Sequence, residues 1–67
     1  MRHQLFKARM RSKLTQAEVA KAVGISRSHY TLIENGKRNP SLEVALRIAN
    51  KVNCDVRHMF GEDKESN

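Results

Sequence analysis

Apolar residues recur every three or four positions along this chain, in short runs separated by small polar turns. Such spacing places one apolar stripe along a helix, because an α-helix completes a turn about every 3.6 residues. No segment alternates apolar and polar residues with the period of two that is typical of a half-buried strand. The pattern therefore predicts an all-α fold, a compact bundle of five helices.

The beginning of the second helix is marked by a local signal. A first helix is predicted over residues 2–12, and the second begins at Thr15 because T-Q-A-E forms a capping box: the Thr15 hydroxyl accepts from the backbone N–H of Glu18, whose side chain accepts from the N–H of Thr15. Gly24 ends this helix, since glycine adopts the left-handed conformation at little cost. Its expected apolar stripe consists of Ala17, Val19, Ala20 and Val23.

A third helix follows after a short turn. Ser26 is its N-cap, Ile25 is a hydrophobic staple before it, and the helix runs to Asn35, where Gly36 closes it. Two helices joined by a short turn with glycine have the spacing of a helix-turn-helix, whose second helix enters the major groove of DNA. The pattern therefore predicts a DNA-binding supersecondary unit.

Two further helices complete the predicted bundle. Ser41 caps the fourth, whose apolar positions are Leu42, Ala45, Leu46 and Ala49. Asp55 caps a short fifth helix with Val56, Met59 and Phe60, and we expect Gly61 to stop it. The domain is accordingly predicted over residues 1–60, followed by a disordered acidic tail over residues 61–67.

The distribution of charge indicates the kind of partner that the protein binds. The chain has 67 residues and a net charge of +6; residues 1–60 hold twelve Lys and Arg against four acids, and residues 61–67 hold one Lys and three acids. A basic body favours a polyanionic partner, most simply nucleic acid, although many basic faces are only solvated.

Other classes of protein are disfavoured. One cysteine, Cys54, forms no internal disulfide and is expected to be a small buried hydrophobe, and His3, His29 and His58 lack metal-ligand spacing, so we expect no metal and no cofactor. The first ten residues lack the apolar run of a signal peptide or a membrane span, which favours a cytoplasmic protein without a membrane partner. The length leaves no room for a ligand-sensing module, and no nucleophile, base and acid converge as in an enzyme.

The third helix has two different faces on a helical wheel. Tyr30 and Ile33 face the core, while the opposite side carries Ser28, Thr31, Leu32 and Asn35, with Arg27 on its flank. Arginine can pair with guanine, serine and threonine donate or accept, and a leucine can meet a thymine methyl, so these side chains suit a groove-reading helix. Ordinary solvent exposure is the alternative, and the helix-turn-helix position favours DNA.

Charged residues near apolar stripes need partners. We expect Arg9 and Glu34 to form an ion pair between the first and third helices, because an unpaired buried charge is costly, and spare N–H groups of Arg9 could reach a phosphate. Gln16 at a helix start and the basic residues Lys37 and Arg38 after the third helix are further candidates for phosphate contacts.

The segments T-Q-A-E-V-A-K-A-V-G-I-S-R and I-E-N-G-K-R-N-P-S-L resemble the phage Cro and repressor helix-turn-helix family, also called XRE-type regulators, from about Leu5 to Phe60. The resemblance implies a lambda-repressor-like five-helix bundle that binds operator DNA as a symmetric dimer. Carried over to matching positions, it implies base contacts by Arg27, Ser28, Thr31 and Leu32, phosphate contacts by Gln16, Asn35, Lys37 and Arg38, and the Arg9 to Glu34 ion pair.

The chain departs from the usual family pattern at three positions. Lys13 stands where a glycine is common, and a left-handed backbone there would cost lysine about 1 kcal/mol. Tyr30 replaces an aliphatic residue, so its hydroxyl needs a polar partner, and the orientation of His29 stays open between a phosphate and solvent.

These features together predict a transcription regulator, most simply a repressor, that binds a palindromic operator on double-stranded DNA as a homodimer and takes no small-molecule ligand. The expected dimer interface contains Leu46, Val52, Val56 and Met59 on the last two helices. Two alternatives remain: a protein-interaction module such as an antitoxin, and a controller of a restriction-modification operon.

Overall fold

The computed structural model describes residues 1–65, with side chains for residues 1–60, and over this range the chain contains helices and no strand. The helices are α1 (His3–Arg11), α2 (Gln16–Val23), α3 (Arg27–Glu34), α4 (Leu42–Lys51) and α5 (Val56–Glu65). The all-α, five-helix prediction is therefore confirmed.

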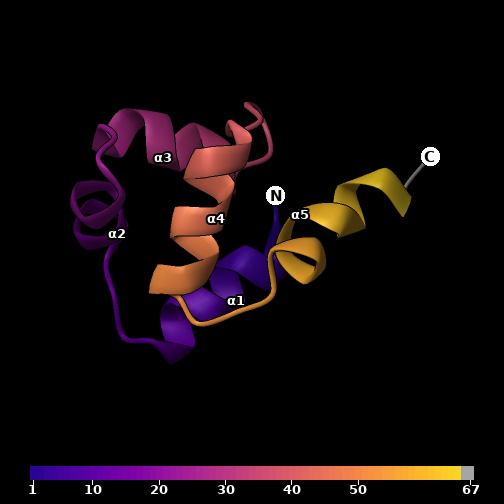
Figure 1. Cartoon of the computed structure of the whole chain (residues 1–67), viewed down its shortest axis with the longest axis horizontal. Coiled ribbons are helices and arrows are strands. Elements are labelled where there is room, and N and C mark those ends of the chain that lie inside the picture. Colours follow the sequence, from indigo (N-terminus) through magenta and orange to yellow (C-terminus); the bar gives the residue numbers. More distant parts are fainter. Residues whose placement is uncertain (66–67) are drawn as a thin grey trace.

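Helix α4 runs through the middle of the bundle and packs against α2 on one side and α5 on the other (Figure 1). Helix α1 packs against α5 and α3, and α2 packs against α3. Helices α2 and α3 consequently lie together on one side of the molecule, where α3 has a face turned away from the core.

Local signals determine where the helices begin and where α2 ends. The Thr15 hydroxyl accepts from the N–H of Glu18 at 3.0 Å and the Glu18 carboxylate accepts from the N–H of Thr15 at 2.8 Å, which completes the predicted capping box. Gly24 ends α2 in the left-handed conformation at φ 82°. Ser26 and Ser41 cap α3 and α4 through their hydroxyl groups, as predicted. These caps satisfy backbone N–H groups that have no partner within their helix.

The core is formed where all five helices meet. Its buried apolar residues are Leu5, Ala8, Val19, Ala20, Val23, Tyr30, Ile33, Ile48, Ala49, Val52 and Met59. Cys54 is half-buried and packs against this core, as expected of a small hydrophobe. No helix within the described range is long and apolar enough to cross a membrane, and the described residues contain no group of three or more potential metal-binding side chains.

Several predicted core positions are wrong. Ala17 is exposed on α2, and on α4 Leu42 is 74% exposed and Leu46 49% exposed. The buried face of α4 is centred on Ala45 and Ile48, and Leu46 is turned by about 100° from Ala45 because successive helical residues differ by that angle. The spacing of the leucines therefore predicted burial at Leu42 and Leu46, which lie outside the buried face of α4.

The predicted dimer interface also requires correction. Val52 and Met59 are buried within the core of a single chain, at 2% and 0% exposure, and so are not available to a second copy. Apolar side chains at the ends of α4 and α5 are needed for this core, since the two helices pack against each other. Only Leu46 and the half-buried Val56 remain at the surface from the predicted set.

Gly61 does not stop α5, which continues to Glu65. Glycine within a helix costs only about 1 kcal/mol relative to alanine, so it does not by itself end a helix that has begun. The tail predicted from residue 61 is therefore helical as far as Glu65, and residues 66–67 lie outside the described residues.

The turn after α1 contains a non-glycine residue with a left-handed backbone, Lys13 at φ 59°. We predict that Lys13→Gly raises the free energy of unfolding by about 1 kcal/mol, because glycine lacks the Cβ atom that crowds this conformation. Denaturant titration measures the change. Asn53→Gly is the matched control: Asn53 has φ 57°, but asparagine tolerates this region, so a smaller gain is expected there. A lower stability for Lys13→Gly would contradict the strain assigned to this turn.

Candidate nucleic-acid interface

Helix α3 has one buried and one outward face. Tyr30, Ile33 and Glu34 are buried, whereas Arg27 and Ser28 are exposed. Residues His29, Thr31 and Leu32 are half-buried. The wheel drawn from the sequence thus separated the core side of the helix from its accessible side, and the accessible side carries all four residues predicted to contact bases.

The four candidate base-contact residues line one open hollow together with Gln16 from the start of α2. A second hollow meets it at Gln16 and Arg27 and extends past the α2 N-terminus to Arg9 and Lys13. Three basic side chains therefore border the two connected hollows. This arrangement offers an anion both positive charge and the N-terminus of α2.

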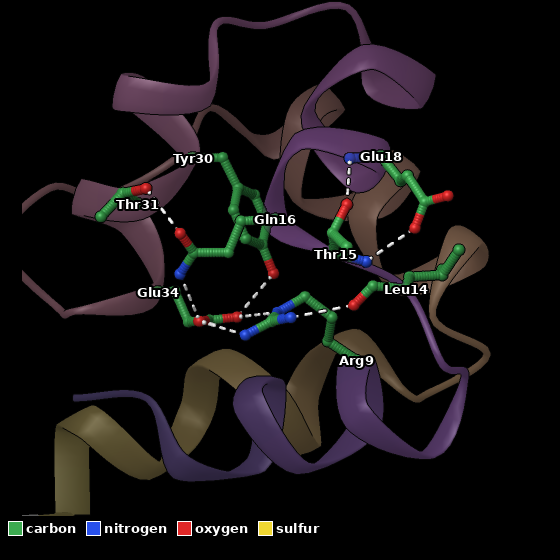
Figure 2. Close-up of polar contacts among 8 residues, drawn as sticks. All are labelled: Arg9, Leu14, Thr15, Gln16, Glu18, Tyr30, Thr31 and Glu34. Atoms are coloured by element: carbon green, nitrogen blue, oxygen red, sulfur yellow. Dashed lines mark hydrogen bonds and ion pairs between the residues drawn. The ribbon is translucent and has the colours of Figure 1, made fainter.

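Beneath this surface lies a buried carboxylate, Glu34, whose two oxygens accept four hydrogen bonds (Figure 2). Arg9 donates from Nε to Oε2 at 2.8 Å and from Nη2 to Oε1 at 3.1 Å. The Tyr30 hydroxyl donates to Oε2 at 2.9 Å, and Gln16 Nε2 donates to Oε1 at 2.8 Å. The predicted ion pair between α1 and α3 is thus present within a larger network.

The ionised form of Glu34 is favoured within this network. Burial alone would raise the pKa of its carboxyl group, but the hydrogen bonds from Arg9, Gln16 and Tyr30 and the charge of Arg9 outweigh burial and lower the pKa below 4.5. The hydrogen bond to Glu34 likewise raises the pKa of Arg9. Burial, followed by the charge of Glu34, raises the pKa of Tyr30, so its hydroxyl keeps the proton that it donates. The need for a polar partner at Tyr30, predicted from the sequence, is met by Glu34.

Gln16 also has a structural role, which its position in the sequence did not indicate. Its amide nitrogen is bonded to Glu34, and its Oε1 accepts from the Thr31 hydroxyl at 2.8 Å. One amide hydrogen is left for the predicted phosphate contact. The sequence contained a partial clue, since Thr31 and Glu34 lie three residues apart on one helix and share the side that faces α2.

Arg9 is also more constrained than predicted. Besides its two bonds to Glu34, it donates from Nη1 to the carbonyl of Leu14 at 2.9 Å, and its guanidinium lies 5.6 Å from the centre of the Phe6 ring. The side chain is only 10% exposed. Two of its five N–H groups remain for the phosphate contact predicted from the sequence.

Arg2 is a functional element that sequence reasoning missed. It is 2% exposed and donates to the carbonyls of Ile33 and Arg38 and to Asn39 Oδ1, while its guanidinium lies 5.2 Å from the centre of the Phe60 ring. The last carbonyls of a helix lack partners within the helix, and a cation there is favourable. Arg2 therefore ties the C-terminal end of α3 and the following loop to α5.

The loop that Arg2 holds carries the remaining predicted phosphate contacts. Asn35 is the C-cap of α3, and it is exposed, as are Lys37 and Arg38 after it. The backbone of this loop is fixed by bonds from the N–H groups of Lys37 and Arg38 to the carbonyl of Leu32 at 2.9 and 3.2 Å. Two cations thus stand at the end of the same helix whose outer face lines the hollow.

Residues 5–58 match the helix-turn-helix family model, which covers the region from α1 into α5. The chain belongs to the helix-turn-helix family. Over 60 residues it is 49% identical to the uncharacterized HTH-type transcriptional regulator YqaF of Bacillus subtilis, covering 90% of this chain and 79% of that protein.

More distant relatives share the domain. An uncharacterized HTH-type transcriptional regulator of Archaeoglobus fulgidus is 38% identical over 65 residues, covering 97% of this chain and 92% of its own length. Antitoxin PezA of Streptococcus pneumoniae is 43% identical over 54 residues, which are 81% of this chain and 34% of that protein. The family is one of transcription regulators, and DNA is its ligand.

Glu34 makes stability depend on pH. Because its folded-state pKa is lowered, its stabilising contribution is complete above the ordinary value of 4.5 and is lost as pH falls through the lower folded-state value. We predict that Glu34→Gln is destabilised near neutral pH, where Arg9 loses its counter-charge, and that its difference in unfolding free energy from wild type shrinks below pH 4.5.

Urea titrations at a series of pH values measure this difference. Glu18 and Asp55 also have lowered pKa values, but both residues are present in both proteins, so their contributions to the pH dependence cancel in the difference. Glu43→Gln serves as the control, because among residues 1–60 the ion pair of this exposed carboxylate is with Arg47 on the surface of α4. A difference in unfolding free energy between wild type and Glu34→Gln that stays constant from pH 7 to pH 3 would contradict an ionised Glu34 in the folded protein.

Proposed function

We propose that this helix-turn-helix protein is a sequence-specific, double-stranded-DNA-binding transcriptional repressor that acts in the cytoplasm, without catalysis or a small-molecule ligand. The observation that carries the proposal is the outward face of α3, where Arg27, Ser28, Thr31 and Leu32 line one open hollow. An α-helix fits the major groove of B-DNA, and these side chain types match the donors, acceptors and methyl groups displayed there.

In this proposal the N-terminal end of α3 contacts bases, and the loop after its C-terminal end contacts phosphates. Arg27 in the first turn pairs with a guanine edge, and its exposed position leaves its guanidinium able to approach the base. Lys37 and Arg38 in the loop after the helix contact the phosphate backbone, together with Asn35 and the remaining N–H groups of Gln16 and Arg9. Phosphate contacts position the helix and base contacts give specificity.

We further propose that two copies bind a palindromic operator, with half-sites about 10 to 10.5 base pairs apart or a multiple of that. Leu46 on α4, which is 49% exposed, and the half-buried Val56 on α5 support this, since each leaves apolar surface that a second copy can cover. Two copies also double the few contacts that one small domain makes with DNA.

A second candidate function is a protein-interaction module, favoured by the similarity to antitoxin PezA. An antitoxin-like chain would bind a protein partner as its main ligand. Against this reading, the outer face of α3 is basic and polar, whereas protein interfaces usually have an apolar centre. A controller of a restriction-modification operon is a narrower form of the DNA-binding proposal, and it makes the same contacts.

Two arginine substitutions separate base contacts from phosphate contacts. Wild-type protein first selects its preferred duplex from a random pool, and a scrambled version of that duplex is the comparison. We predict that Arg27→Ala reduces the difference in binding free energy between the two duplexes by about 1 to 3 kcal/mol. Arg38→Ala should weaken both duplexes equally and lower the slope of log affinity against log salt concentration by about one, because it removes one phosphate contact. Fluorescence anisotropy at several salt concentrations measures both effects.

Arg57→Ala is a control, because this exposed arginine lies on α5 and pairs with Asp55. It should change neither specificity nor the salt slope. Equal losses on both duplexes for Arg27→Ala would contradict base reading by this residue. Binding of wild type that is equally weak on every sequence would favour the protein-partner candidate.

The dimer proposal predicts that Leu46→Glu shifts the protein toward monomer, because it places a carboxylate in the surface proposed to be covered. Sedimentation equilibrium at high micromolar concentration, with and without operator DNA, measures this shift. Lys21→Glu makes a larger charge change, two units against one, on the exposed side of α2 and should still leave the dimer intact. A wild-type protein that sediments only as a monomer, also on DNA, would defeat the proposal.

A further inference from the structure

We propose that Thr31 presents only a hydrogen-bond acceptor to DNA, so that it selects a base with an exocyclic amine in the major groove, adenine or cytosine, at one position of the site. This inference deepens the proposed function and rests on it. It follows from the direction of each hydrogen bond that leads from Glu34 to Thr31 (Figure 2).

The chain of hydrogen bonds begins at a group that cannot donate. Glu34 is ionised, and a carboxylate only accepts hydrogen bonds. Arg9 holds it in this state through a two-pronged contact at 2.8 and 3.1 Å, and Tyr30 adds a hydroxyl donor at 2.9 Å. Every neighbour of the carboxylate must therefore turn a hydrogen toward it.

This requirement fixes the amide of Gln16. The atom that lies 2.8 Å from Glu34 Oε1 must be its nitrogen, since an amide oxygen there would face a carboxylate oxygen with no hydrogen between them. The opposite end of the amide, Oε1, then points to Thr31. An amide oxygen also accepts only.

Thr31 must consequently give its hydroxyl hydrogen to Gln16, over 2.8 Å. A hydroxyl has one hydrogen and two lone pairs, so the only capacity left at Oγ1 is to accept. Thr31 is half-buried and lines the hollow with Arg27, Ser28 and Leu32, which puts this acceptor on the surface proposed to face the bases.

The edges of the bases in the major groove respond differently to such an acceptor. Adenine offers its N6 amine and cytosine its N4 amine as donors, whereas guanine O6, thymine O4 and the purine N7 atoms only accept. An acceptor opposite these last atoms leaves two sets of lone pairs facing each other, which is unfavourable. Ser28 differs, because its exposed hydroxyl makes no hydrogen bond to another described residue and can rotate to donate or accept.

The test compares variants by selection of bound duplexes from a random pool at physiological salt. For wild type we expect one position of the half-site to favour a base pair that presents an amine to Thr31 by about tenfold, the value of one well-made hydrogen bond against an unpaired group. Thr31→Val, which keeps the shape and removes the hydroxyl, should abolish this preference and so identify the position.

Gln16→Met is the decisive variant, because it leaves Thr31 in place and releases its hydrogen. It also removes the proposed phosphate contact of Gln16, which weakens binding to every sequence alike and does not change the base preference at one position. The Thr31 hydroxyl can then donate as well as accept, so the amine preference at the same position should fall to about twofold or less. Glu34 keeps its bonds from Arg9 and Tyr30 in this variant, and thermal unfolding confirms that the fold persists. Arg57→Ala is the control, because this exposed arginine lies on α5 away from the hollow, and it should retain the full preference at that position.

Three results would overturn the inference while leaving the proposed function intact: a wild-type site without an amine preference that depends on Thr31, an unchanged preference in folded Gln16→Met, or loss of the preference in Arg57→Ala. No enrichment of any sequence by wild type would overturn the proposed function itself, and the inference with it.

Discussion

The buried carboxylate of Glu34 is the constraint on which the rest of the structure depends. A charge in the core is tolerated only when it is paired and hydrogen-bonded, and removing one partner of such a pair costs about 3 to 5 kcal/mol. The donors that satisfy Glu34 come from three helices: Arg9 on α1, Gln16 on α2 and Tyr30 on α3 itself. Satisfying one carboxylate therefore fixes the relative positions of the first three helices.

The hydrogen bonds that stabilise the fold also reach the outer face of α3. Glu34 and Thr31 lie about one turn apart on this helix, and Gln16 bonds to both, so the buried network includes a side chain that lines the hollow. Arg2 adds a second attachment at the same C-terminal end of α3, where it binds the carbonyls of Ile33 and Arg38. The C-terminal half of α3 and the basic loop after it are thus held by two separate sets of hydrogen bonds.

Features with local causes could be predicted from the sequence. The capping box at Thr15, the left-handed Gly24 and the serine caps follow from residues a few positions apart, and all are present in the structure. The Arg9 to Glu34 pair was also predictable, because two charges near apolar stripes need each other. The helical wheel likewise separated the buried face of α3 from its accessible face.

Features that depend on distant contacts could not be predicted. Arg2 looks like any basic residue near a chain end, and its partners lie more than 30 positions away. The exposure of Leu46 depends on which neighbours α4 meets, and Gln16 was interpreted from its position at a helix start, although its amide is held by Glu34 and Thr31. Side-chain roles within a shared network require knowledge of how the helices are oriented, which helical periodicity does not provide.

The most direct test of the central claim, that this network presents the outer face of α3 to DNA, is a nuclear magnetic resonance titration of the isotope-labelled chain with a short DNA duplex. The account predicts that the largest backbone amide shifts occur at Gln16, at Arg27 to Leu32 and at Lys37 and Arg38. Largest shifts on α4 and α5, with α3 unchanged, would contradict it.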